Sequence, residues 1–296
     1  MNHDSWLYEV EEFRADMEDH VAEMDCQNGL SLNTPEEVLS YVKEYNVSSI
    51  RIWFTDMLGF LKSFSITPKE LPGAFSEGMG FDGSSIQGYR RIHESDMVAF
   101  PIASTAQVLP FRPGGSNSMR MFAQICTPDG LPYQSCPRVI LSQNLERLTE
   151  HGFSHMNIGP EAEFFYFKDS SGPTLLDQAG YFDINPTDVG DDIREATVFA
   201  LETMGVPVEY HHSEVGPSQH EIDIRYQEAL RMADNLQTYK YIVKEVARRC
   251  GVFATFMPKP LFEDNGSGMH VHSSIWKKNK TLMYKKGNYA DLSDFS

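Results

Sequence analysis

Residues 256–274, with the sequence FMPKPLFEDNGSGMHVHSS, constrain the fold more than any other segment of this chain. An Asn-Gly-Ser-Gly turn is followed by His270, His272 and Ser274 at every second position. Because side chains alternate between the two faces of a β-strand, this spacing predicts that the three polar groups share one face. The glycines let the backbone approach a ligand closely. Two imidazoles and a hydroxyl beside such a turn suit a metal ion and a polyphosphate.

Charge and composition exclude several classes of partner. The chain has 296 residues and a formal net charge of −17, so nucleic acid and anionic membranes would repel it, and we expect neither as a main partner. No apolar run approaches the roughly 20 residues that span a bilayer, and the N-terminus has no secretory signal pattern. Four widely spaced cysteines without a CxxC pair are typical of a reduced, cytoplasmic protein.

The first part of the chain predicts a helix followed by a small mixed domain. Residues 4–24 carry apolar side chains at steps of mostly three or four, which indicates an amphipathic helix with an acidic outer face. A second helix is expected from Thr34, because Glu37 lies at the capping-box position and a proline follows the cap. Strands are expected at 48–55 and 61–66, and the Arg-Pro-Gly-Gly-Ser-Asn run at 112–117 is the clearest linker signal.

Beyond that linker, strands and helices are interspersed without strict alternation, which favours an α+β domain over a doubly wound sheet. Helices are expected after Pro137, near 191–204 and over 227–250; strands are expected at 119–126, 157–167, 206–211, 219–226, 252–256 and 267–276. We therefore divide the chain into a helical extension at 1–33, an α+β domain at 34–112 and a second α+β domain at 113–296.

Two glutamates precede the apolar run FFYF. Glu161 and Glu163 are two positions apart, so both carboxylates are expected on one strand face. Two like charges 4 Å apart repel by about 4 kcal/mol at an effective dielectric near 20, so solvent, a shared proton or a cation must offset the repulsion. An isolated Glu-x-Glu pair is often simply solvated, but here Gly159-Pro160 and the apolar run flank it.

A second acidic pair lies in the segment HHSEVGPSQHEIDIRY. Glu221 and Asp223 share a strand face, and a Gly-Pro-Ser turn after Glu214 can fold that carboxylate back toward Glu221. This pattern fits either a polar sheet face with a salt bridge or a cation site. Mg²⁺ and Mn²⁺ take oxygen ligands, Mn²⁺ also accepts imidazole, and two such cations neutralise nucleotide phosphates during phosphoryl transfer. The adjacent His211 and His212 are interpreted as ordinary polar residues on opposite faces.

Six segments in this order resemble the glutamine synthetase family, in particular its prokaryotic type I members. They are WFTDMLGFLKSF (53–64), FDGSSIQGYRRIHESDM (81–97), GPEAEFFYF (159–167), GYFDINPTD (180–188), HHSEVGPSQHEID (211–223) and TFMPKPLFEDNGSGMH (255–270). The resemblance implies an N-terminal β-grasp domain followed by a catalytic α+β domain with an antiparallel sheet. It also implies a homo-oligomer, a dodecamer of two hexameric rings, with active sites between neighbouring subunits. The family's final third has no counterpart in this sequence.

The resemblance also implies roles for individual residues. Glu163, Glu214 and Glu221 would bind one Mg²⁺ or Mn²⁺, and Glu161 and His270 would bind the second. Glutamate would contact Glu163, Asn265 and Gly266, and ATP would contact Glu209, Tyr226, His272 and Ser274. Asp56, which by itself looks like a turn residue, would be supplied to a neighbouring subunit's site to deprotonate ammonium. Arg91 matches an arginine linked to feedback inhibition.

The implied activity is ligation of ammonia to glutamate with ATP, through γ-glutamyl phosphate, which yields glutamine, ADP and phosphate. Two alternatives stay open from the residues. One is a γ-glutamyl ligase that accepts another amine. The other is a non-catalytic short form that binds nucleotide and metal or joins full-length subunits, since several family motifs are missing.

Overall fold

The computed structural model describes residues 3–86 and 95–296, which form two compact units. The first unit is His20–Gly152, and the second unit combines Met1–Asp19 with Phe153–Ser296. The helix expected at the N-terminus is α1 (His3–Glu23), whose buried side chains include Val10, Met17 and Val21, as its periodicity predicted. No helix in the described ranges is long and apolar enough to cross a membrane.

A mixed sheet forms the core of the first unit. Its strands run in the order β2-β1-β6-β4-β3, with β5 paired to β6. The strands are β1 (Ser49–Thr55), β2 (Leu61–Ile66), β3 (Met79–Asp82), β4 (Asp96–Pro101), β5 (Gln107–Val108) and β6 (Ser118–Cys126). The helices are α2 (Pro35–Glu44), α3 (Leu71–Ser76) and α4 (Pro137–Glu150), with 3₁₀ turns η1 (Gly83–Ser85), η3 (Ala103–Thr105) and η4 (Pro113–Gly115). The helices and the mixed sheet agree with the small α+β domain that the sequence predicted here.

Local signals in this unit are confirmed, but the expected domain boundary moves. Thr34 accepts a hydrogen bond from the backbone of Glu37, and Glu37 accepts one from the backbone of Thr34, which completes the predicted capping box. The turn at 112–117 does not end the domain. β6, which follows it, pairs in parallel with β1 and in antiparallel with β4, so its residues belong to the first sheet.

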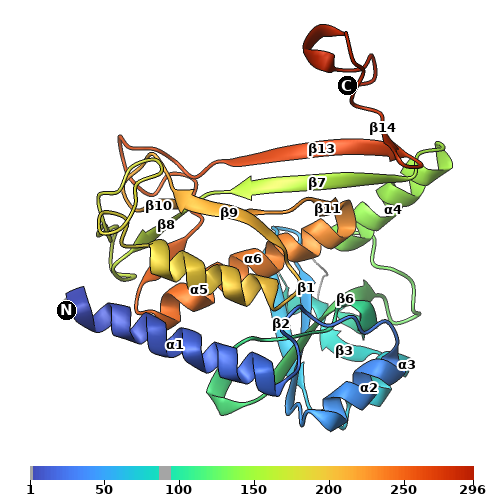
Figure 1. The fold of residues 1–296 in the computed structure, drawn as a ribbon. Helices are drawn as coiled ribbons and strands as arrows, with labels where there is room; N and C mark the ends of the chain where they lie inside the picture. The colour runs from blue at the N-terminus through green and yellow to red at the C-terminus, as the bar shows by residue number, and fades with distance from the viewer. Residues whose placement is uncertain (1–2, 87–94) are drawn as a thin grey trace. The chain divides into compact units, whose positions relative to one another are not determined.

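The second unit contains two four-stranded antiparallel sheets, ordered β12-β8-β10-β9 and β11-β7-β13-β14. Their strands are β7 (His155–Ala162), β8 (Phe164–Phe167), β9 (Val208–Ser213), β10 (Gln219–Ile224), β11 (Gln227–Glu228), β12 (Phe253–Thr255), β13 (Met269–Lys277) and β14 (Lys280–Thr281). A 3₁₀ turn, η5 (Tyr289–Asp291), follows β14 near the end of the chain. Figure 1 shows the long strands β7 and β13 side by side.

The single strand expected at 157–167 is in fact two strands that belong to different sheets. β7 ends at Ala162 and β8 begins at Phe164, so Glu163 lies at the junction between the two sheets. The four residues after Glu163 are fully buried aromatics. Glu161 and Glu163 therefore lie at the boundary between a polar sheet face and the apolar core.

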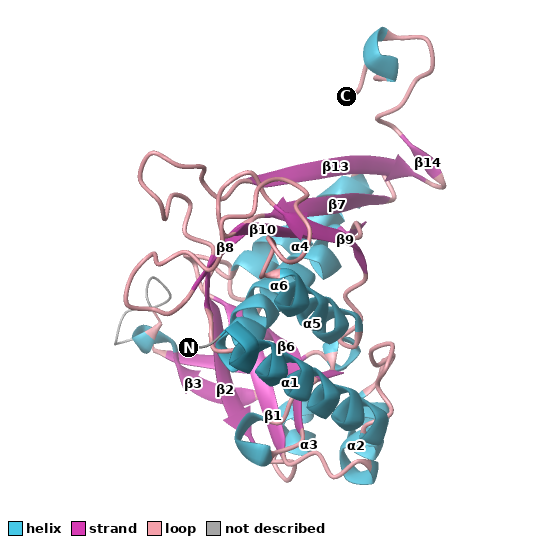
Figure 2. Ribbon diagram, turned by 60° about the vertical axis from the view of Figure 1, so that its left-hand side comes forward, coloured by secondary structure: helices cyan, strands magenta, loops and turns pink. Residues whose placement is uncertain are grey.

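Two helices cover the strands of the second unit. α5 (Asp191–Glu202) and α6 (Ala229–Arg249) pack against each other and against β9, β7 and β12 (Figures 1 and 2). The buried hydroxyl of Tyr239 on α6 donates to the carbonyl of Ala162, 2.8 Å away, at the end of β7. This bond fixes the strand end immediately before Glu163.

Candidate functional site

The outer part of the site lies on the paired strands β7 and β13. His270 is the cross-strand partner of Glu161, and His272 and Ser274 follow on the same face, as the alternation predicted. One carboxylate oxygen of Glu161 lies 3.3 Å from Nδ1 of His270, and the other lies 2.8 Å from Nε2 of His272. Both imidazoles are largely exposed, so this end of the site is open to a ligand from solvent.

The junction residue Glu163 is held by the loop that precedes β13. Its Oε2 accepts hydrogen bonds from Nε2 of Gln219 at 2.6 Å and from the backbone N–H of Gly268 at 3.0 Å. A Cβ added at Gly268 would lie 2.7 Å from Oε1 of Glu163, so a larger residue there would displace this carboxylate. Gln219 also donates to the carbonyl of Gly266 at 2.9 Å and thereby ties the loop to Glu163.

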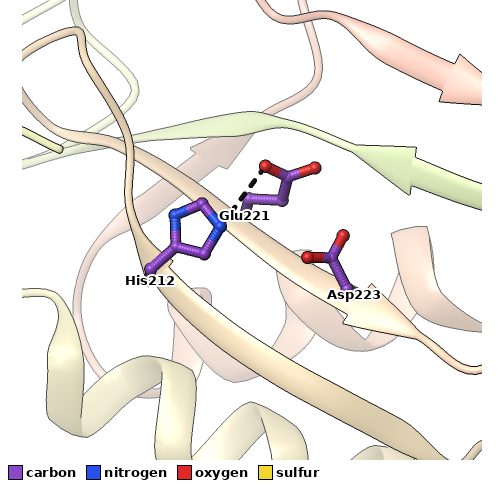
Figure 3. Close-up of side chains that lie close together, drawn as sticks. All are labelled: His212, Glu221 and Asp223. Atoms are coloured by element: carbon purple, nitrogen blue, oxygen red, sulfur yellow. Dashed lines mark ion pairs between the residues drawn. The ribbon is translucent and has the colours of Figure 1, made fainter. Parts of the chain in front are cut away.

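The inner part of the site consists of two cross-strand pairs between β9 and β10. Glu221 is opposite His212, and Asp223 is opposite Tyr210. Oε2 of Glu221 lies 3.6 Å from Nε2 of His212 (Figure 3). Glu214 hydrogen-bonds Glu221, so the turn after Glu214 does fold this carboxylate back as predicted. His212, Glu221 and Asp223 are all buried, and each offers a ligand atom within 4.8 Å of the others.

Burial and mutual repulsion disfavour ionisation of these carboxyl groups. Burial raises the pKa of Glu221 to about 9, with further contributions from Asp223, Glu214 and Glu163. Burial likewise raises the pKa of Asp223, and the charge of Glu161 adds to the effect. The influence of Glu163 and Glu161 on these buried groups means that the two strand pairs form one electrostatic cluster.

This donor set fits divalent cations. Carboxylate oxygens are the preferred ligands of Mg²⁺ and Mn²⁺, and the imidazoles at the edges add donors that Mn²⁺ accepts. Carboxyl groups whose ionisation is suppressed by their neighbours become ionised when a cation supplies opposite charge. The cluster therefore has the chemistry of a cation site.

Of the residues expected to contact a nucleotide, His272 contacts Glu161, and Tyr226 lies beside Gly159 of β7. A Cβ at Gly159 would lie 3.4 Å from Cβ of Tyr226 and 3.9 Å from that of His272, so both side chains are neighbours of this position on β7. Tyr226 is exposed, and Glu209 forms a 3.5 Å ion pair with Arg225 at the surface. Ser274 accepts a 2.9 Å hydrogen bond from the indole N–H of Trp276.

The residues expected to contact glutamate lie in the loop before β13. Gly266 is connected to Glu163 through Gln219, and a Cβ at this position would lie 2.5 Å from the carbonyl oxygen of Pro258. The backbone N–H of the neighbouring Asn265 donates to the side chain of Asp264 at 2.8 Å. The loop thus has a defined conformation beside the cluster.

Asp56 belongs to the first unit and is almost fully buried in the β1–β2 turn. Its Oδ1 accepts hydrogen bonds from the backbone N–H groups of Leu58 and Phe60, each at 2.9 Å, and its Oδ2 lies 3.3 Å from Nζ of Lys62. Within its own unit Asp56 therefore stabilises a turn. Arg91 lies outside the residues that the structure describes.

Sequence reasoning missed three members of the cluster. His212 was interpreted as an ordinary polar residue, Asp223 received no role, and Gln219 was not considered. The position of Asp223, two residues after Glu221 on one strand, was a usable signal. Nothing local indicates that His212 is opposite Glu221, because that pairing depends on the hairpin register.

Comparison with known proteins identifies the family. The family model for the glutamine synthetase catalytic domain matches residues 134–296, and the model for its β-grasp domain matches residues 46–128. A glutamine synthetase of Methanosarcina mazei is 48% identical over 264 residues, which cover 88% of this chain and 59% of that protein. One of Mycobacterium tuberculosis is 46% identical over 265 residues with the same coverage.

Solved structures agree with these sequence matches. The cryo-electron microscopy structure of Plasmodium falciparum glutamine synthetase aligns with a TM-score of 0.81 at 29% identity. The alignment covers 90% of this chain and 58% of that one. The chain thus spans about three fifths of the length of the relatives it matches. Its two matched domains, in the family's order, show that this chain belongs to the glutamine synthetase family.

Proposed function

We propose that this chain carries the amino-terminal part of an ATP-dependent ligase site that joins ammonia to the γ-carboxylate of glutamate. The observation that carries the proposal is the convergence of Glu161, Glu163, Glu214 and Glu221 from separate segments onto one cluster, within the matched catalytic domain. Metal and nucleotide chemistry need such a convergence, whereas a solvated sheet face does not.

In the proposed reaction an oxygen of the γ-carboxylate attacks the γ-phosphorus of ATP, and the bond to the departing ADP breaks. Ammonia then attacks the acyl carbon of γ-glutamyl phosphate, phosphate leaves, and a proton is lost from nitrogen. Tyr226, Glu209, His272 and Ser274 would orient the nucleotide, and Asn265, Gly266 and Glu163 would hold glutamate. These assignments are supported by the position of the residues around the cluster.

Two Mg²⁺ or Mn²⁺ ions, when bound, would neutralise charge on the transferring phosphoryl group. Glu163, Glu214 and Glu221 would hold one ion, and Glu161 with His270 would hold the other. The hydrogen bonds from Gln219 and Gly268 would keep the Glu163 carboxylate oriented.

Asp56 is proposed as the base that deprotonates ammonium in the site of a neighbouring subunit. Support comes from its surroundings, since Met57, Leu58 and Phe60 beside it are each at least half exposed. An apolar hairpin tip of this kind is typical of a surface that a second subunit covers. If Asp56 acts in the site of a neighbouring subunit, the protein must form a homo-oligomer. A dodecamer and a cytoplasmic location remain predictions from the sequence.

A second candidate function is nucleotide and metal binding without turnover. It needs only the acidic cluster and its neighbours in the matched catalytic domain, and the turnover measurement separates it from the ligase. The remaining alternative is a γ-glutamyl ligase that accepts an amine other than ammonia. Activity with ammonia compared with activity with organic amines distinguishes the two ligases.

The test is a γ-glutamyl transfer assay on the purified 296-residue chain, with Mn²⁺ and ADP, alongside Mn²⁺-dependent ADP binding. We expect Glu163→Gln to abolish metal-dependent nucleotide binding, and the exposed control Glu202→Gln to behave as wild type. Binding with turnover supports the ligase, and binding without turnover supports the second candidate. Metal-independent binding that survives Glu163→Gln would refute both.

A further inference from the structure

We propose that His212, Glu221 and Asp223 form a separate, buried site for a divalent transition-metal cation. The site would share Glu221 with the cation position proposed above, and to that extent it builds on the proposed function. Its other two members are assigned neither by the family resemblance nor by the comparisons.

The three side chains are placed by strand geometry. Glu221 and Asp223 are two positions apart on β10 and share one face, and His212 on β9 is the cross-strand partner of Glu221. Figure 3 shows the Asp223 carboxylate turned toward the other two groups. Their ligand atoms lie within 4.8 Å of one another, and the residues are 9%, 7% and 5% exposed. By contrast, the side chains of His270 and His272 at the outer part of the site are largely exposed.

The hydrogen bond of His212 orients its metal-binding nitrogen. Nδ1 of His212 lies 3.1 Å from the carbonyl oxygen of Ser213, and a carbonyl only accepts, so Nδ1 carries the hydrogen. In the neutral ring Nε2 then presents a lone pair, and it lies 3.6 Å from Oε2 of Glu221. Two acceptors facing each other need either a proton, which the carboxyl of Glu221 can carry, or a cation between them. A backbone carbonyl that fixes the far nitrogen is the usual support of a histidine ligand.

Asp223 provides an independent observation. Its Oδ1 is buried and, within the described part of the chain, has no hydrogen-bond partner. An unpaired buried carboxylate oxygen is costly. The Tyr210 hydroxyl and the Glu221 carboxyl both hydrogen-bond Asp223, yet its Oδ1 is left without a partner. A cation between Asp223 and Glu221 would satisfy this atom.

Charge and donor type indicate which ion fits. Once a cation displaces the proton of Glu221, the two carboxylates and a neutral imidazole carry a charge of −2, so a divalent cation makes the buried group neutral overall. Mg²⁺ takes oxygen ligands and keeps its waters, whereas Mn²⁺ and Zn²⁺ accept imidazole. The site therefore selects a transition metal over Mg²⁺.

An imidazolium is the competing explanation, since a protonated His212 would pair with Glu221 and with Glu214, which lies 3.6 Å from Nδ1. That arrangement leaves Oδ1 of Asp223 unsatisfied. It also needs no metal, so spectroscopy of bound Mn²⁺ separates the two arrangements.

The decisive experiment uses the full chain with His270→Gln and His272→Gln, two changes at exposed positions. Mn²⁺ is added in the presence of a large excess of Mg²⁺, and pulsed electron paramagnetic resonance records nitrogen coupling to the bound Mn²⁺. We expect imidazole coupling to persist, because His212 remains. Loss of the coupling, or displacement of all Mn²⁺ by Mg²⁺, overturns the proposal.

Two further variants test the remaining donors. Asp223→Asn and His212→Gln, each in that same background, are expected to weaken retention of Mn²⁺ against Mg²⁺ by about 10-fold or more, and Glu202→Gln is expected to have no effect. Wild-type retention in Asp223→Asn refutes the site; if that variant does not fold, the nitrogen coupling in the background protein decides. If the chain without substitutions shows no transfer activity while the His270→Gln, His272→Gln protein retains the nitrogen coupling, the ligase proposal fails and this site stands.

Discussion

Glu221→Gln should stabilise the cation-free protein at neutral pH, although it removes a proposed ligand. The pKa of Glu221 rises from 4.5 to about 9, chiefly because the residue is buried and secondly because Asp223 lies beside it. Between these values the folded chain keeps a proton that the unfolded chain has released. Its free energy of unfolding therefore falls by about 1.4 kcal/mol for each unit of rising pH.

From pH 4.5 to pH 7 this loss accumulates to about 3 kcal/mol. Glutamine has nearly the same shape, does not ionise, and can donate to Glu214 as the protonated Glu221 does. We therefore expect Glu221→Gln to be more stable than wild type by up to about 3 kcal/mol at pH 7, with the difference vanishing near pH 4.5. Asp223 titrates in both proteins, so most of its own effect cancels from the difference.

Urea unfolding in EDTA at several pH values measures this difference. Glu202→Gln, at an exposed position of α5, should show a small difference from wild type that does not change with pH. A Glu221→Gln protein that is less stable at pH 7, or whose advantage does not grow with pH, would refute the reasoning. With Mn²⁺ present we expect the order to reverse, because the ion stabilises only the chain that binds it well.

Three further predictions concern the surroundings of the site and the fold. Thr34→Ala should lower the free energy of unfolding by about 1 kcal/mol, measured by urea titration, and Thr34→Ser should restore most of it; equal stability of all three would contradict the role of the capping box. Gly266→Ala should increase hydrogen exchange in the loop before β13, because its Cβ would lie 2.5 Å from the carbonyl of Pro258, whereas Gly172→Ala, with open space around it, should not. All four cysteines are free and buried, and burial raises the pKa of Cys250 to about 12, so a thiol reagent should label the protein only after denaturation; fast labelling of the native chain would count against this packing.

Features that depend on a few neighbouring residues could be predicted from the sequence. The capping box at Thr34, the alternation through His270 and the fold-back of Glu214 depend on local spacing, and the structure contains all three. The run at 112–117 was predicted as a linker between two domains. It forms a turn within the first unit, because a turn in the backbone does not determine which sheet the next strand joins.

Features that depend on pairing between distant segments could not be predicted in this way. Gln219 reaches Glu163 across 56 positions, and the register of β9 against β10 brings His212 opposite Glu221. A shift of one residue in that register would turn His212 to the other face and leave a different pair of side chains opposite the carboxylates. Register is set by packing of the whole sheet, and no local motif encodes it.

The position of the acidic cluster explains how the fold tolerates it. Glu163 is followed directly by β8 (Phe164–Phe167), whose four aromatic side chains are buried in the core. Each buried aromatic contributes roughly 1.5–3 kcal/mol, so this one strand supplies about 6–12 kcal/mol. That exceeds the loss of about 3 kcal/mol that suppressed ionisation of Glu221 entails at neutral pH. β8 also pairs with β10, which carries Glu221 and Asp223. The destabilising carboxyl groups therefore lie on a strand that is hydrogen-bonded to the stabilising aromatic strand.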